Sequence, residues 1–175
     1  MHLDTPEYVV RPTQRSDASA LNSVYFNITG RLRTESEFAW EWFGAPLGTN
    51  DSYVIISKQT QKIVGHHGLI KIPLVVGDKT LLAGRTENSM LLPEYRRSIN
   101  YAMIEMRLLH TAFKDYDVIV TTAGQRAQYA VRMRLGYKDC GPWTIDRRNS
   151  GARYYLRKSL SKITSRLNKS EWSDE

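Results

Sequence analysis

The chain has 175 residues, 41% of them hydrophobic, and a formal net charge of +7. This size predicts one domain with a full core, and no apolar run approaches the roughly 20 residues that cross a bilayer. The first five residues lack the charged and apolar regions of a secretion signal, so we expect a soluble, cytoplasmic protein. Cys140 is the single cysteine, which excludes an internal disulfide and a thiolate zinc cluster. The positive charge favours an anionic partner: nucleic acid, an acidic membrane, or a cofactor with several phosphates.

The N-terminal part of the chain predicts a strand followed by a helix. Residues 8–12 form the expected strand. Ser16 or Asp17 then caps a helix, and Gly30 ends it. The apolar residues of this helix recur at helical spacing and are Ala20, Leu21, Val24, Tyr25 and Ile28.

A second helix is expected to begin at Thr34, because Glu37, three residues later, completes a capping-box pattern. The helix carries two tryptophans, Trp40 and Trp42, which either wall a substrate cleft or pack the helix against the core. Residues 44–51 are rich in Gly, Pro, Asn and Asp, so we expect a loop there.

The middle of the chain predicts an antiparallel meander. Gly77 and Asp78 mark a hairpin turn, and the last strand ends at Leu92. The predicted strands are residues 53–57, 63–70, 72–76 and 80–83, and the last of these leads towards the strand that ends at Leu92.

The next segment predicts a helix, a strand and a second helix. The first helix directs Ile99, Ala102, Met103, Met106, Leu109 and Phe113 to one face, with the methionines in the core. Residues 117–122 form a mostly apolar strand, expected to pair in parallel with the strand before the helix. Residues 125–135 form the second helix, closed by Gly136.

The C-terminal segment predicts weak strands at 143–145 and 153–156, then a basic amphipathic helix. We therefore divide the chain into a domain over residues 1–156 and a helix with a tail over residues 157–175. The apolar seam of this helix either covers the domain or contacts a twin subunit in a homodimer. Binding of the basic face to a membrane surface or nucleic acid is the other interpretation.

The order of these elements and the residues at their joints resemble the GNAT superfamily of acyl-CoA-dependent N-acetyltransferases, from Tyr8 to about Tyr155. Four segments carry the resemblance: Val10-Arg11-Pro12 with Asp17, Ile63-Val64-Gly65-His66, Leu92-Pro93-Glu94-Tyr95-Arg96, and Leu135-Gly136-Tyr137. The resemblance implies an α/β (α+β) fold with a mixed, mainly antiparallel central sheet flanked by helices. It also implies transfer of an acetyl or related acyl group from acetyl-CoA, or another acyl-CoA, to an amine.

The resemblance places the acyl thioester in a gap between residues 87–92 and 117–122. Backbone N–H groups near Met90 and Leu91 would stabilise the oxyanion. The pyrophosphate would lie at the turn into the following helix, where free N–H groups favour anions. The cofactor-binding residues so implied are Met90, Leu91, Leu92, Arg96, Arg97, Ser98, Ile99, Asn100, Tyr101 and Gln125.

The sequence departs from the family pattern at two places. The turn at residues 96–101 has no glycine, so Arg96, Arg97 and the Ser98 hydroxyl would have to compensate by charge-assisted bonds. The position of the family's proton-donating tyrosine holds Arg132, which is no acid at neutral pH. Tyr129, one helical turn earlier, is our candidate for that role.

Glu87 is the candidate base, and the alternative is a structural carboxylate paired with an arginine such as Arg85. Strand alternation would place Asn88 on the opposite face. His66 and His67 are adjacent on a strand, so their rings should point apart, and we expect no metal site.

The resulting hypothesis is an N-acyltransferase acting on an amine of a small molecule, sugar or peptide. The alternative is a catalytically inactive GNAT-like module that binds a ligand or partner. Nucleic-acid binding ranks last, because no motif for reading or stacking on bases is present.

Overall fold

Six strands of the described residues follow one another in chain order across a single sheet. The computed structural model describes residues 2–96, 101–112, 114–122 and 126–141. The strands are β1 (Leu3–Asp4), β2 (Tyr8–Pro12), β3 (Asp51–Ser57), β4 (Ile63–Val76), β5 (Lys79–Leu91) and β6 (Val118–Val120). Neighbours from β1 to β5 pair antiparallel, and β6 pairs in parallel with β5. The predicted mixed, mainly antiparallel sheet is confirmed.

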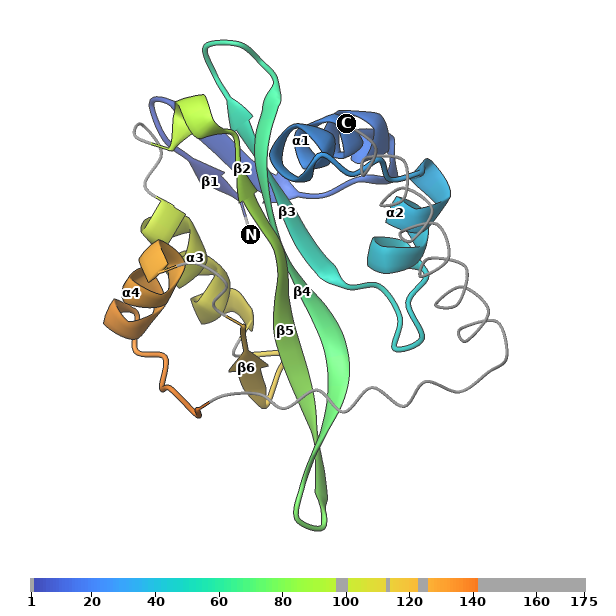
Figure 1. Ribbon diagram of the computed structural model, residues 1–175, viewed down its shortest axis with the longest axis vertical. Coiled ribbons are helices and arrows are strands. Elements are labelled where there is room, and N and C mark those ends of the chain that lie inside the picture. The colour runs from blue at the N-terminus through green and yellow to red at the C-terminus, as the bar shows by residue number, and fades with distance from the viewer. Residues whose placement is uncertain (1, 97–100, 113, 123–125, 142–175) are drawn as a thin grey trace, which may run out of the picture. The chain divides into compact units, whose positions relative to one another are not determined.

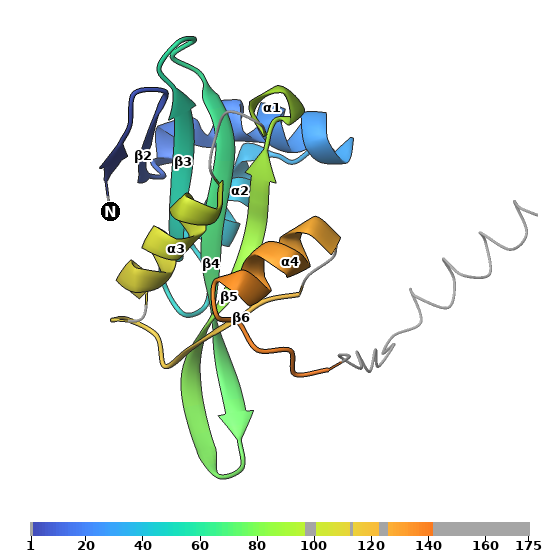
Figure 2. The same ribbon diagram turned by 90° about the vertical axis from the view of Figure 1, so that its left-hand side faces the viewer.

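Helices cover both faces of this sheet (Figure 1). α1 (Ala18–Thr29) and α2 (Glu35–Phe43) lie on one face, and α3 (Tyr101–Ala112) and α4 (Arg126–Arg134) lie on the other. Short 3-10 turns, η1 (Arg15–Asp17) and η2 (Pro93–Tyr95), precede α1 and follow β5. Figure 2 shows α3 and α4 in front of the strands. No helix in the described part of the chain is long and apolar enough to cross a membrane.

The ends of the N-terminal helices follow the capping signals in the sequence. Thr34 accepts a hydrogen bond from the backbone of Glu37, whose carboxylate accepts one from the backbone of Thr34, so the capping box of α2 is present. Gly30 ends α1 in the left-handed conformation, with φ of 70°. Asp17 stands before α1, but its carboxylate pairs with Arg11 at 2.8 Å instead of capping the helix.

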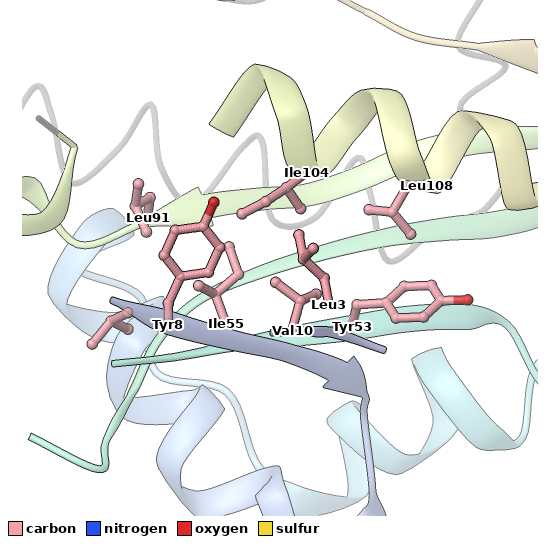
Figure 3. Close-up of a cluster of buried hydrophobic side chains, with 9 residues drawn as sticks. Leu3, Tyr8, Val10, Tyr53, Ile55, Leu91, Ile104 and Leu108 are labelled. Atoms are coloured by element: carbon pink, nitrogen blue, oxygen red, sulfur yellow. The ribbon is translucent and has the colours of Figure 1, made fainter. Parts of the chain in front are cut away.

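The core lies in two layers, one on each side of the sheet. The larger packs the sheet against α3 and includes Tyr8, Val10, Ile55, Ile104 and Leu108 (Figure 3). The other packs Phe38 and Trp42 of α2 against α1 and β3. Apolar residues of α1, α2 and α3 therefore hold these helices against the sheet.

Three features differ from the sequence prediction. β1 was not predicted, because two residues are too short to show an alternating pattern. The expected strands at 63–70 and 72–76 form one continuous strand, β4. The predicted core face of α3 is wrong at Met106, which is 41% exposed, since the inward face carries Ile104, Glu105 and Leu108.

Residues up to Lys138 belong to one compact unit, and residues 139–175 belong to a second. The predicted strands at 143–145 and 153–156 and the basic helix after residue 157 lie outside the described residues.

Candidate functional site

The parallel strands β5 and β6 separate after a short ladder. The ladder joins residues 83–85 to residues 118–120 and ends at Arg85 and Val120. One residue further, the hydroxyls of Thr86 and Thr121 are 2.5 Å apart. β5 then continues to Leu91, and no described strand pairs with that edge. The backbone groups of this segment are therefore available to a ligand on the side of β6.

A β-bulge changes the direction of side chains within this segment. The register between β4 and β5 shifts between His66 and Gly68, opposite Asn88, which has a positive φ of 48°. The side-chain amide of Asn88 donates a hydrogen bond to Glu41 of α2 at 3.0 Å. The prediction that Asn88 and Glu87 face opposite sides is wrong, because the bulge interrupts strand alternation and both residues interact with Glu41.

Glu87, the candidate base, forms an ion pair with Arg85 at 2.7 Å on the side of the sheet covered by α2. The carboxylate is one-third exposed, so solvent and small molecules reach it. The structure thus contains the pairing with Arg85 that the sequence left as an alternative. A paired carboxylate with an exposed edge still accepts a proton, so this contact is compatible with either role.

Glu41 is a second carboxylate at this point, and the sequence analysis missed it. It accepts hydrogen bonds from Arg33 at 2.8 Å and from Asn88 at 3.0 Å. Burial raises the pKa of its carboxyl, the nearby charge of Glu87 also raises it, and Arg33 opposes the shift. The signal in the sequence was a glutamate between two tryptophans, one helical turn after the capping residue Glu37.

A cavity of about 490 Å³ opens beside these carboxylates. It lies between α1, α2 and the β4–β5 hairpin, and its lining includes Tyr25, Arg31, Trp40, Glu41, Leu47 and Arg85. The two tryptophans of α2 have different roles. Trp42 is fully buried in the core, whereas Trp40 is 63% exposed and lines the cavity.

The opposite face of β5 carries a buried polar cluster below α3. The hydroxyls of Ser89 and Tyr101 lie 2.7 and 2.6 Å from Nδ1 of His67. Burial lowers the pKa of His67 to about 3, so the imidazole is neutral at physiological pH. Burial also raises the pKa of Tyr101. The contact with His67 thus directs the phenol of Tyr101 towards the sheet.

Arg132 of α4 lies where the strands separate. Its Nε donates to Glu105 of α3 at 2.9 Å, and its Nη2 is 3.4 Å from the hydroxyls of Thr86 and Ser89. Arg132 and Glu105 are both buried. The position at which the resemblance would place a tyrosine thus holds a guanidinium fixed by a buried carboxylate.

The remaining predicted cofactor residues divide into three groups. Met90 and Leu91 are buried, so their backbones rather than their side chains border the gap. The backbone N–H of Leu92 donates to Val64, and Nε of Arg96 donates to the carbonyl of Leu91 at 3.1 Å. Arg97, Ser98, Ile99, Asn100 and Gln125 lie outside the described residues.

Tyr129 lies on α4, one turn before Arg132, and is 42% exposed. The rings of His66 and His67 point to opposite sides of the sheet, as predicted. His66 contacts Trp42 of α2, whereas His67 contacts Tyr101 of α3. The described residues contain no group of three or more His, Cys, Asp or Glu that would hold a metal ion.

No protein-family model matches the chain, and no curated protein is significantly similar to it in sequence. Solved structures do share its fold. The aminoglycoside antibiotic 6'-N-acetyltransferase AAC(6')-Ih from Acinetobacter baumannii superimposes with a TM-score of 0.64 at 16% identity, covering 82% of this chain and 99% of that one. The aminoglycoside N-acetyltransferase AAC(6')-Iy in complex with CoA superimposes with a TM-score of 0.65 at 11% identity. The match covers 85% of this chain and 99% of that one. Glucosamine-6-phosphate N-acetyltransferase from Arabidopsis thaliana superimposes with a TM-score of 0.59 at 10% identity. The match covers 84% of this chain and 100% of that one.

Proposed function

Because the chain has the fold of the GNAT superfamily, we propose that it is an acyltransferase that moves an acetyl or related acyl group from acyl-CoA to an amine of a small molecule. The observation that carries this proposal is the edge of β5 beyond Arg85, next to the bulge at Asn88, with which no described strand pairs. An extended chain with amides, such as pantetheine, pairs with an edge of this kind. The solved structures named above are acetyltransferases, and one of them is a complex with CoA.

The residues around this edge fit an acyl thioester. Backbone N–H groups near Met90 and Leu91 would polarise its carbonyl, and the bulge at Asn88 interrupts regular pairing just before these residues. Arg96, residues 97–101 and Gln125 remain our candidates for binding the phosphates. CoA supplies the acyl group as an activated thioester, so the protein contributes position, charge and a route for protons.

The proposed reaction is direct attack, with no covalent intermediate on the enzyme. The amine nitrogen forms a bond to the carbonyl carbon, the carbon–sulfur bond breaks, and the amine proton passes to the carboxylates Glu87 and Glu41. Tyr129 is our candidate for returning a proton to the leaving thiolate. Arg132, held at the point where the strands separate, would stabilise the negative charge of that thiolate.

Titration calorimetry with acetyl-CoA, followed by a thiol-release assay over a panel of amines, tests this proposal. We expect saturable binding of acetyl-CoA and amine-dependent release of free thiol. No heat and no thermal shift at millimolar acetyl-CoA would reject it. Binding without turnover on any amine, sugar or peptide would support the alternative of a binding module.

A further inference from the structure

The cavity beside Glu41 has a lining in which cationic residues outnumber acidic ones. Its lining holds Arg31, Arg33, Lys71 and Arg85 against Glu37 and Glu41. An acceptor site for a polycationic amine would need the reverse balance, because like charges repel in a partly enclosed space. The cavity therefore favours an acceptor that brings negative charge with its amine.

Contacts within the protein neutralise some of these charges and leave others available. Arg33 is paired with Glu41, and the carboxylate of Glu37 accepts hydrogen bonds at the start of α2. Among the residues that the structure describes, no carboxylate lies within 4 Å of the side-chain nitrogens of Arg31 or Lys71. Nε of Arg85 is buried without a hydrogen-bond partner in the same described set, although Nη2 of that side chain binds Glu87. Two arginines of the cavity thus retain donors for an anion.

The positions of these groups separate an amine end from an anionic end. The carboxylates Glu41 and Glu87 flank the bulge at Asn88, where the proposed transfer takes place. Arg85 holds Glu87 at 2.7 Å, so the charge of Glu87 is already paired and Glu41 is the carboxylate of the cavity lining that stands next to the bulge. Arg31 approaches from the loop between α1 and α2. The exposed face of Trp40 lies along the same cavity and offers an apolar surface on which a sugar ring packs.

We infer that the acceptor is an amine built on a sugar-sized ring that also carries an anionic group, a phosphate or a carboxylate, which Arg31 and Arg85 bind while the amine faces Glu41. This inference rests on the proposed function and narrows its substrate class. It separates this cavity from one suited to polycationic amines, although the fold is shared.

Binding of matched amines in the absence of acyl-CoA tests the inference independently of catalysis. The probes are glucosamine, glucosamine 6-phosphate, muramic acid and tobramycin, each titrated calorimetrically into the full chain at low ionic strength. We expect glucosamine 6-phosphate or muramic acid to bind about tenfold or more tightly than glucosamine, and tobramycin to bind more weakly than either. The stronger of the two anionic probes identifies the phosphate or the carboxylate as the preferred group.

Charge reversal at Arg31, an exposed residue, completes the test. Arg31→Glu should weaken binding of the anionic probe about tenfold and leave the affinity for glucosamine unchanged. Lys79→Glu is the matched control, because Lys79 makes the same change of charge at the exposed tip of the β4–β5 hairpin, outside the cavity lining. Circular dichroism of both variants confirms that they are folded.

Three results would overturn the inference: equal binding of glucosamine and its anionic counterparts, tighter binding of tobramycin, or an equal loss in Lys79→Glu. Absence of binding by all four probes at millimolar concentration would also overturn it. The calorimetric titration with acetyl-CoA reports separately on the proposed function, so the two failures are distinguishable.

Discussion

Arg132 and Glu105 form a buried ion pair between α4 and α3. A tyrosine at position 132 would deliver a proton, whereas a guanidinium delivers only charge and hydrogen bonds. Burial of this ion pair carries a desolvation cost that the 2.9 Å contact and the neighbouring hydroxyls offset. The pair therefore has a structural role that can be measured apart from activity.

We expect Arg132→Met to destabilise the protein by about 3–5 kcal/mol, because it leaves Glu105 buried without its partner. Urea denaturation measures this change. The double variant Arg132→Met with Glu105→Leu should recover most of the loss, since no unpaired charge remains. Arg134→Met, at an exposed position of the same helix, should change stability by no more than about 0.5 kcal/mol. Equal effects at Arg132 and Arg134 would contradict the prediction.

The raised pKa of the Glu41 carboxyl has a measurable consequence. As a base in the proposed reaction, its raised pKa places the acid limb of the pH–rate profile above the ordinary carboxyl value of 4.5. Glu41→Gln should lower kcat about 100-fold or more and remove that limb. Glu87→Gln should move the limb to lower pH, because the charge of Glu87 raises the pKa of Glu41. Glu35→Gln, exposed in the first turn of α2, serves as the control. An unchanged pH–rate profile in both Glu41→Gln and Glu87→Gln would exclude these two carboxylates as the base.

At the scale of elements, the packing of α2 on β4 depends on a residue without a side chain. The ring of Trp42 lies against Gly68, where a Cβ atom would come within 2.2 Å of Cη2. Neither residue can change alone without moving the helix or the strand. This contact fixes the distance between Glu41 on α2 and the bulge of β5, which pairs with β4 next to Gly68.

Gly68→Ala should therefore cost about 1–3 kcal/mol, because the added methyl group overlaps the indole ring. Thermal unfolding with a two-state fit gives the value. Trp42→Phe combined with Gly68→Ala should cost less than the sum of the two single changes, since the smaller ring makes room for the methyl group. Gly44→Ala is the matched control, because its nearest contact is 3.5 Å. A loss in Gly68→Ala no larger than in the control would refute the overlap.

Elements with a local signal were predictable from the sequence, and elements set by long-range contacts were not. The capping box at Thr34, the turn at Gly77 and the closing Gly136 each fix an end of a helix or strand by local backbone chemistry. The bulge at Asn88 depends on the pairing of β5 with β4, so no local pattern shows it. Glu41 was missed in the sequence for the same reason, because only the fold brings it next to Asn88. The face of α3 was misplaced because a buried charge, Glu105, interrupts its apolar stripe.

At the scale of the whole molecule, the two buried histidines predict acid sensitivity. Burial lowers the pKa of His66 and of His67 to about 3, against an ordinary value of 6.5. The unfolded chain therefore binds protons below pH 6.5 that the folded chain does not bind until about pH 3. Stability is present in full above pH 6.5 and is lost as the pH falls through that window.

We expect each histidine to contribute about 1.4 kcal/mol of lost stability per pH unit below 6.5. Urea denaturation at pH 7, 6 and 5 measures this slope. His66→Gln should reduce the slope, because one of the two groups no longer titrates. A stability that stays constant from pH 7 to pH 5 would show that the histidines are not held neutral.

The sequence predicts that residues 157–175 form a helix separate from the domain over residues 1–156. Truncation after Leu156 should leave a protein that unfolds cooperatively and binds acetyl-CoA with unchanged affinity, if residues 157–175 form a separate helix. Far-ultraviolet circular dichroism with a denaturant titration tests the first point, and calorimetry tests the second. Loss of cooperative unfolding would show that the terminal segment belongs to the domain.

Beyond Leu82, whose backbone binds Asp117, no other described strand pairs with the outer part of the β4–β5 hairpin. β6 pairs with β5 at residues 83–85, and β3 pairs with β4 only as far as Leu69, so the ribbon beyond them projects as two strands (Figure 1). Val75 and Val76 near its tip are 69% and 55% exposed. Amide protons along this ribbon should consequently exchange with deuterium in a gradient, fastest at the tip and slowest near Gly65, as the hairpin opens from its free end.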